Sequence, residues 1–190
     1  MEYRTKYKSI VFIGKIASGK GTQANFVLNH FGGVLYSNGN KLREVSQDSS
    51  IFGRKMKAVY ESGNLLPEWV ASYWMTHALV SQHADELVVF EAVAKKPHEA
   101  ELFHEMHDYL GRPYIVFHIN VTDEVVHERS KARARDIVDA AHSVETRLAM
   151  FKLHTQKSID LFREKGVLID IDGSKSSEAV KEEIFNYLVK

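Results

Sequence analysis

The sequence predicts an α/β fold in which helices flank a doubly wound parallel sheet of five strands. Short apolar runs alternate with longer stretches in which apolar residues recur at helical spacing, a pattern typical of parallel sheets covered on both faces. A glycine-rich segment, Gly14-Lys-Ile-Ala-Ser-Gly-Lys20, directly follows the first apolar run. The 190 residues suffice for one compact domain with insertions.

The expected strands are five short apolar runs: Ile10–Ile13, Val34–Tyr36, Leu87–Phe90, Tyr114–Val121 and Val167–Ile171. Helical spacing predicts helices over Gly21–Phe31, Pro67–His83 and His98–Leu110. Pro67 suits the first turn of its helix, where an N–H would have no helical partner. Two regions are expected to be insertions into the sheet framework. They are a helical stretch from Gly39 to about His83 and a basic segment from Arg129 to about Ala141.

Composition excludes several classes of site and partner. The 25 basic and 25 acidic residues balance, so nothing indicates a nucleic-acid or anionic-membrane surface. The chain has no cysteine, which removes disulfides, thiolate zinc sites and cysteine nucleophiles. No apolar stretch approaches the roughly 20 residues of a membrane span, and the apolar run near the N-terminus is too short for a signal peptide. We therefore expect a cytoplasmic protein without membrane or nucleic-acid partners.

The glycine-rich segment fits the phosphate-binding pattern G-x-x-x-x-G-K and has the context that this motif requires, a strand before it and a helix after it. Gly14 and Gly19 let backbone amides turn toward a phosphate, and the helix starting near Lys20 directs its positive end at the anion. Lys20 is expected to reach the outer phosphates, and the Thr22 hydroxyl to help hold Mg²⁺. The alternative is a turn whose glycines only satisfy backbone geometry.

The letters G-K-G-T-Q-A at 19–24 resemble the P-loop of adenylate kinases and related nucleoside monophosphate (NMP) kinases, and the resemblance extends through nearly the whole chain. It implies a single P-loop NTPase-like domain with a core of residues 1–37, 84–128 and 142–190. An NMP-binding insertion then spans about 38–83 and a short lid about 129–141. Family members carry Pro-Gly where this chain has Ile16-Ala17, a departure expected to change phosphate binding little. The resemblance implies ATP and Mg²⁺, with ATP bound by Gly14, Ala17, Ser18, Gly19, Lys20, Gly21, Thr22, Arg129, Arg133 and Gly173.

The segment Tyr36–Arg43 resembles the family pattern S-T-G-D-x-L-R, which lines the site of the acceptor monophosphate. By this resemblance Asn38, Gly39 and Arg43 bind substrate, and Arg43 clamps the acceptor phosphate with its planar fork. Asn40 replaces the family's aspartate, which is associated with hydrated Mg²⁺. Taken alone, Asn-Gly-Asn also fits a turn followed by a helix N-cap.

Two further segments are similar to acceptor-site motifs of the family. The letters G-N-L-L-P resemble G-x-L-V-P, which contacts the nucleoside, so Leu65 and Leu66 are expected to bind substrate. The stretch E-A-V-A-K-K-P-H-E aligns with D-G-F-P-R-x-x-x-Q. Glu91 then keeps a carboxylate at the strand end, where it could order Mg²⁺-bound water. Lys95 replaces the arginine that grips the acceptor phosphate, which keeps the charge but loses the planar fork.

Glu99 stands where the family has the glutamine that reads the adenine edge. A glutamine amide can donate to adenine N1 and accept from its amino group, whereas an ionised glutamate only accepts. Two acceptors instead suit the adjacent N–H donors of guanine or the amino group of cytosine. The alternative for Glu99 is a solvated residue on a helix.

A helix is expected after Thr122, which can cap it, because acidic residues fill the first turn. Arg129 and Arg133 are four residues apart and so share one helix face, which fits either a phosphate chain or a solvated face. The family borders its lid with R-x-x-x-R…R-x-D-D…R-L, matched by Arg129, Arg133, Arg135 and Arg147, with one extra residue after Arg135. A short lid without cysteines resembles the subgroup that carries no zinc. Gly173 lies in a segment similar to the strand and turn that face the donor adenine.

These features predict ATP-dependent phosphoryl transfer to an NMP, most simply ATP and AMP giving two ADP. Arg135 and Arg147 are expected to bind the monophosphate, and lid closure to exclude water. Two alternatives stay open: the same chemistry on GMP or CMP, because of Glu99 and Lys95, and a nucleotide-binding pseudokinase without transferase activity. We expect a monomer. The cations expected around the transferring group are Lys20, Arg43, Lys95, Arg129, Arg135 and Arg147.

Overall fold

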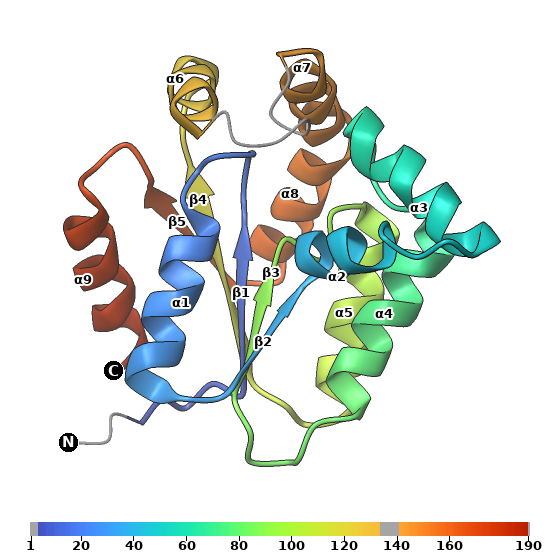
Figure 1. The fold of residues 1–190 in the computed structure, drawn as a ribbon. Helices are drawn as coiled ribbons and strands as arrows, with labels where there is room; N and C mark the ends of the chain where they lie inside the picture. Colours follow the sequence, from blue (N-terminus) through green and yellow to red (C-terminus); the bar gives the residue numbers. More distant parts are fainter. Residues whose placement is uncertain (1–3, 134–140, 190) are drawn as a thin grey trace.

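The computed structural model describes residues 4–133 and 141–189, and its centre is a five-stranded parallel sheet (Figure 1). The strands lie in the order β2-β3-β1-β4-β5, which confirms the predicted α/β class. Ser9 at the start of β1 lies level with Val88 on one side and Tyr114 on the other. The strands are β1 (Ser9–Ile13), β2 (Val34–Ser37), β3 (Val88–Glu91), β4 (Tyr114–Asn120) and β5 (Leu168–Asp172).

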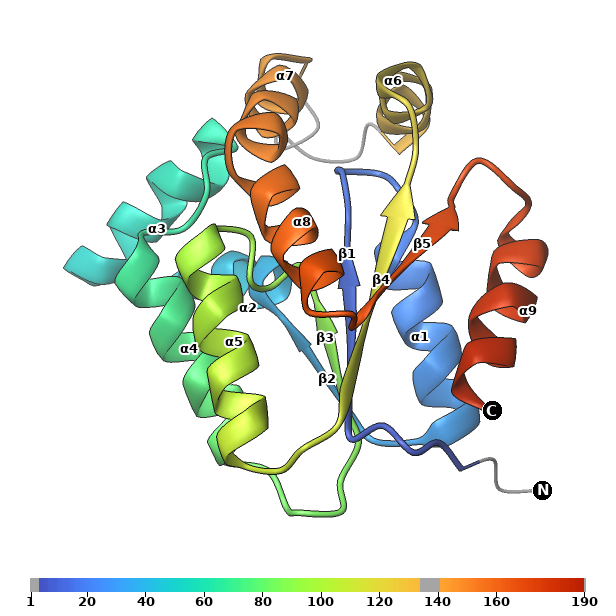
Figure 2. The same cartoon turned by 180° about the vertical axis from the view of Figure 1, so that it is seen from behind.

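Helices connect the strands and cover the sheet on both faces (Figures 1 and 2). One π-helical turn, η2, joins α7 directly to α8. The helical elements are α1 (Lys20–Phe31), α2 (Asn38–Val45), α3 (Ile51–Ser62), α4 (Glu68–Val80), α5 (Pro97–Tyr109), α6 (Asp123–Arg133), α7 (Ala141–Met150), η2 (Phe151–Thr155), α8 (Gln156–Glu164) and α9 (Ser177–Leu188).

The sheet has an apolar core on each face, because successive strand residues point to opposite sides. Ile10 and Phe12 of β1 face α1 and α9, where they pack with residues such as Val27 and Ile184. Val11 and Ile13 face the other side, and the helices that pack there are α4, α5 and α8. Figure 2 shows α6 and α7 beyond the carboxyl ends of the strands, which is where doubly wound sheets bind their ligands.

The structure corrects two local predictions about helix starts. Asn38 and Asn40 lie inside α2 rather than in a turn, and the cap is Ser37, whose Oγ accepts a hydrogen bond of 3.3 Å from the Asn40 N–H. Pro67 precedes α4 as its N-cap instead of lying within the first turn. Ser37 and Pro67 both have an extended ψ, which ends the segment before each helix. Helix α2 therefore begins earlier than predicted, at Asn38, and α4 begins at Glu68, one residue after Pro67.

At the amino ends of β1, β3 and β4, Arg112 ties three segments together. Its guanidinium donates to Ser9 Oγ at 3.3 Å and to the Lys8 carbonyl at 3.0 Å. It also donates to the carbonyl oxygens of His83, Ala84 and Glu86, in the loop before β3. Arg112 is buried, so these carbonyls supply the partners that water would otherwise provide.

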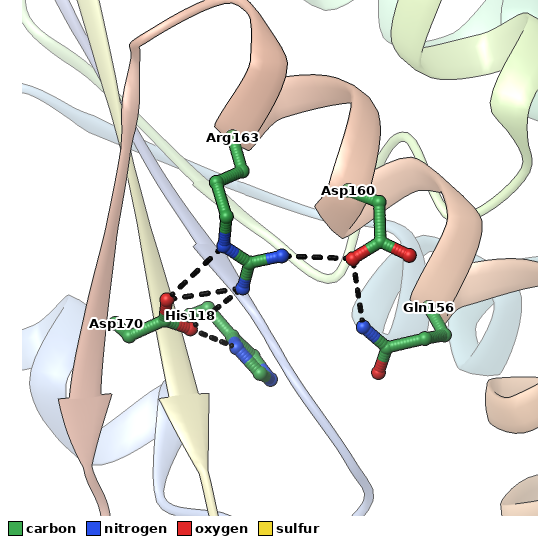
Figure 3. Close-up of polar contacts among 5 residues, drawn as sticks. All are labelled: His118, Gln156, Asp160, Arg163 and Asp170. Carbon is green, nitrogen blue, oxygen red and sulfur yellow. Dashed lines mark hydrogen bonds and ion pairs between the residues drawn. The ribbon is translucent and has the colours of Figure 1, made fainter.

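A polar network joins β4 and β5 to α8 (Figure 3). Asp170 of β5 accepts from His118 Nδ1 of β4 at 2.7 Å and from Arg163 of α8. Arg163 also reaches Asp160 at 2.8 Å, and Gln156 donates to the same carboxylate at 3.1 Å. The His118 and Arg163 contacts together hold the pKa of Asp170 below its usual value although burial raises it.

Helices α2, α3 and α4 fall within the predicted NMP-binding insertion of 38–83. The predicted lid of 129–141 is described only to Arg133 and from Ala141, so Arg135 lies outside the described residues. Among the described residues, no helix combines the length and apolar character needed to cross a membrane.

Candidate functional site

A cleft of about 360 Å³ lies over the carboxyl ends of the central strands. Its walls come from the loop after β1 with the start of α1, helix α2, the end of α3 with the loop after it, Ala71 of α4, residues 91–99, and the α7–η2 region. Sequence-predicted residues on its walls are Gly14, Ala17, Gly19, Lys20, Gly21, Asn38, Gly39, Arg43, Leu65, Leu66, Glu91, Lys95, Glu99 and Arg147.

The loop after β1 has the shape of a phosphate cradle. Gly14 has φ 147°, and a Cβ there would collide with the Ile119 carbonyl, so only glycine fits. Helix α1 begins at Lys20, which points the N-terminal amides into the loop. The buried Lys20 ammonium donates to the Lys15 carbonyl and to Ser18 Oγ at 3.3 Å, so it is folded over the loop that it would serve.

Three alanines beside the cleft have left-handed backbone conformations: Ala17 at φ 57°, Ala92 at 57° and Ala94 at 51°. This region costs an L-residue about 1 kcal/mol relative to glycine. Ala17 and Ala92 stand where the family patterns have glycine. The departure at Ala17, predicted to change phosphate binding little, places an alanine in a backbone conformation that favours glycine. Proline cannot adopt a positive φ, so the backbone at Ala94 differs from any that the family's D-G-F-P-R could form.

Glu91 lies between the acceptor side and the phosphate loop. Ser37 Oγ donates to Glu91 Oε2 at 2.9 Å, and a Cβ on Gly21 would lie 3.4 Å from Oε1. A carboxylate facing the loop in this way fits a Mg²⁺ ion held by nucleotide phosphates and water. The described residues contain no cluster of three acidic or histidine side chains that would bind a metal alone. Gly21 lines this cleft, but Thr22, the next residue of α1, does not, because successive residues of a helix point about 100° apart.

Lys95, Glu99 and Arg147 line the same end of the cleft. Burial and the nearby Arg147 lower the pKa of Lys95, while Glu91 and Glu99 oppose this shift. Glu99 is only 2% exposed, so the alternative of a solvated glutamate is wrong. Its Oε2 accepts from the backbone N–H groups of Lys95 at 2.9 Å and Lys96 at 3.4 Å. Burial nevertheless raises the pKa of the Glu99 carboxyl above its usual value.

Arg43 of α2 has two side-chain partners. Its Nη1 donates to Asn40 Oδ1 at 3.1 Å, and its Nε donates to Tyr60 Oη at 3.3 Å. Asn38, also on α2, is buried and accepts from the Tyr36 hydroxyl at 2.8 Å. The family's aspartate position thus carries an amide here, and that amide contacts the arginine that the sequence predicts to clamp the phosphate.

A second cleft, of about 320 Å³, lies on the other side of the phosphate loop. Arg129 of α6 borders it and donates to the carbonyls of Ser18 at 3.3 Å and Gly173 at 2.9 Å. A Cβ on Gly173 would approach Ile119 Cγ2 to 2.6 Å, so a side chain does not fit. Predicted residues on this cleft are Ala17, Ser18, Gly19, Thr22, Arg129 and Gly173. Of the other lid arginines, Arg133 ends α6 and Arg135 lies outside the described residues.

The phosphate loop is tied to the helices around the lid by one carboxylate. Asp123 at the start of α6 pairs with Lys15 of the loop and with Lys152 of η2, both at 2.7 Å. The two ammonium groups lower the pKa of Asp123. Loop, α6 and η2 therefore share one ion-pair network.

Sequence reasoning missed several residues on the cleft walls. Ser37 could have been found as the cap before a helix, since serine is a preferred N-cap. Lys15 occupies a variable position of the G-x-x-x-x-G-K pattern. Tyr60 lies outside the motifs, and only the packing of α2 against α3 brings it to Arg43. Other cleft-lining residues without a sequence signal are Asn64, Met150, Phe151 and Thr155.

Comparison with known proteins agrees with this geometry. The family profile described as adenylate kinase matches residues 12–167. A protein of Methanosarcina mazei named adenylate kinase is 26% identical, with 96% of this chain and 99% of the relative aligned. The adenylate kinase 1 of Synechocystis is 28% identical (91% and 92% aligned), and the adenylate kinase of Archaeoglobus fulgidus is 27% identical (96% and 98%). Since the profile covers most of the chain and both clefts are built on its motifs, the protein belongs to the adenylate kinase family.

Proposed function

We propose that the protein transfers the γ-phosphoryl group of ATP to a nucleoside monophosphate, with AMP as the preferred acceptor. Family membership supports NMP phosphoryl transfer as the general chemistry. The observation that carries the proposal is that one cleft is lined both by Lys20 of the phosphate loop and by Arg43, Lys95 and Arg147 on the acceptor side. Such an arrangement supplies what phosphoryl transfer needs, which is positioning and positive charge.

Each part of the cleft has a role in this proposal. The loop amides and Lys20 hold the outer phosphates of the donor, and Arg43 and Lys95 hold the acceptor phosphate. Arg147, which is close enough to Lys95 to lower the pKa of that lysine, stabilises the charge that develops on the transferring group. Apolar residues on the walls, among them Leu42, Val59 and Phe151, reduce the access of water. Mg²⁺, when bound near Glu91, neutralises phosphate charge.

The position of Glu99 favours CMP as a second candidate over GMP. Its Oε2 is used by two backbone amides, which leaves Oε1 to meet the base. A single acceptor suits one exocyclic amino group, as on adenine or cytosine. Guanine instead presents two adjacent donors, N1–H and N2–H₂, that match two available carboxylate oxygens.

The test is ADP formation from ATP with AMP, CMP and GMP as separate acceptors. We expect the order AMP, then CMP, then GMP. Lys20→Ala should lower kcat/KM by about 10²- to 10³-fold, as loss of a charge-stabilising group usually does. Circular dichroism of Lys20→Ala controls for folding. If no monophosphate is phosphorylated while calorimetry still detects ATP binding, the protein is a nucleotide-binding pseudokinase and the proposal fails.

A further inference from the structure

Tyr60 is a cleft residue that no motif of the sequence points to. It lies near the end of α3 and lines the main cleft. Its hydroxyl accepts a hydrogen bond from Arg43 Nε at 3.3 Å, and the Arg43 guanidinium carbon lies 6.0 Å from the centre of its ring. The two residues are 17 positions apart and meet because α2 packs on α3.

Arg43 needs such support because it is exposed and has many rotamers. Ordering a free arginine at the moment of binding costs about 0.5–1.5 kcal/mol. Asn40 holds Nη1 at 3.1 Å from the same helix, but one bond does not fix the plane of the guanidinium. The Tyr60 hydroxyl holds Nε, and a cation over an aromatic ring gains further attraction.

The two hydrogen bonds leave the useful donors of Arg43 available. A guanidinium carries five N–H donors. The bonds to Tyr60 and Asn40 occupy Nε–H and one N–H of Nη1, so the remaining Nη1–H and both N–H groups of Nη2 can form a fork toward a phosphate.

We propose that Tyr60 is a positioning residue, which acts through Arg43 to pre-form the clamp for the acceptor phosphate. The proposal rests on the proposed function, because that function assigns Arg43 to the acceptor. Lys95 lacks the fork of an arginine, so a pre-formed Arg43 supplies geometry that Lys95 does not.

The experiment is calorimetric binding of AMP and of adenosine, which lacks the phosphate, to wild type, Tyr60→Phe, Arg43→Ala and the double variant. Tyr60→Phe should weaken AMP binding by about 3- to 10-fold. Adenosine binding should not change, and Tyr60→Phe should have no further effect on AMP in the Arg43→Ala background. Tyr73→Phe, on the exposed face of α4, is the matched control and should leave both affinities as in wild type.

The positioning role is overturned if Tyr60→Phe binds AMP as wild type does. It is also overturned if Tyr60→Phe weakens AMP binding equally in the presence and absence of Arg43. Loss of adenosine binding as well would mean that Tyr60 only supports the fold. Because calorimetry needs no turnover, a protein that shows the expected cycle but forms no ADP contradicts the proposed function and supports the role of Tyr60.

Discussion

The Glu99 carboxylate accepts a hydrogen bond of 2.9 Å from the backbone N–H of Lys95. The residue expected to read the acceptor base therefore also satisfies backbone amides at the start of α5. Oε2 of Glu99 accepts from both backbone amides, and the proposed function assigns Oε1 to the acceptor base. The different partners of the two carboxylate oxygens determine the expected effect of a substitution at Glu99.

Glu99→Gln should raise kcat/KM for AMP about tenfold relative to CMP, the effect of roughly one added hydrogen bond. The amide oxygen can keep the cap, since glutamine serves at this helical position as glutamate does. The amide N–H₂ then faces the cleft and can donate to adenine N1. Kinetics with both acceptors measure this, with the exposed Glu101→Gln as control. An unchanged AMP to CMP ratio would show that Glu99 does not contact the base.

Ala17→Gly and Ala92→Gly should each stabilise the protein by about 0.5–1 kcal/mol, because glycine removes the cost of a left-handed backbone. Urea unfolding followed by circular dichroism gives the free energies. Ala24→Gly, in the buried middle of α1, is the matched control and should destabilise by about 1 kcal/mol or more. If all three variants lose stability, positive φ is not a burden at the two loop positions.

Arg112→Lys should lower the free energy of unfolding by roughly 2–4 kcal/mol, although the charge is kept. A lysine ammonium cannot reach the Ser9 hydroxyl and the carbonyls of two separate segments at once. Arg54→Lys is the control, since the side chain of the exposed Arg54 donates to the Ser49 carbonyl rather than to several segments. Its effect should stay within about 0.5 kcal/mol. Equal midpoints for both variants in urea would refute the structural role of Arg112.

Acidification should destabilise the fold through His107. Burial lowers the pKa of this histidine to about 4 from 6.5, and its Nδ1 lies 2.7 Å from the Phe103 carbonyl. Between pH 6.5 and 4 the unfolded chain binds a proton that the folded protein does not. The contribution of His107 to the free energy of unfolding should therefore fall by about 3 kcal/mol over this range and then level off. Burial lowers the pKa of His118 too, which adds to the loss.

NMR titration of the His107 ring checks the lowered pKa without any variant. Urea unfolding at several pH values then compares wild type with His107→Phe, which should lose most of the pH dependence assigned to this residue. A His107 ring that titrates near pH 6.5 in the folded protein would contradict the prediction.

The sequence predicted the sheet well because the three central strands, β1, β3 and β4, are runs of mostly apolar residues buried on both faces, and such runs need no tertiary context to be recognised. It also predicted the phosphate loop, whose glycines meet backbone requirements that are local. The partners of Arg43 and Glu99 were beyond it. Tyr60 reaches Arg43 only through helix packing, and the burial of Glu99 depends on segments far away in the chain. The positive φ at Ala17 also gives no signal, since alanine is usually placed in helices.

The π-helical turn η2 affects the direction in which side chains of α8 point relative to those of α7. Arg147 and Ile159 are twelve residues apart, so on an unbroken α-helix they would point roughly 120° apart. The extra residue of a π turn reduces this to roughly 20°. With the π turn in place, one continuous helical segment directs Arg147 into the cleft and Ile159 into the core. Deleting one residue from 151–155 should turn this segment into α-helix and leave both directions unchanged, because residues eleven apart on an unbroken α-helix also point roughly 20° apart. The π turn therefore lets the chain carry one more residue without moving Arg147 out of the cleft or Ile159 out of the core.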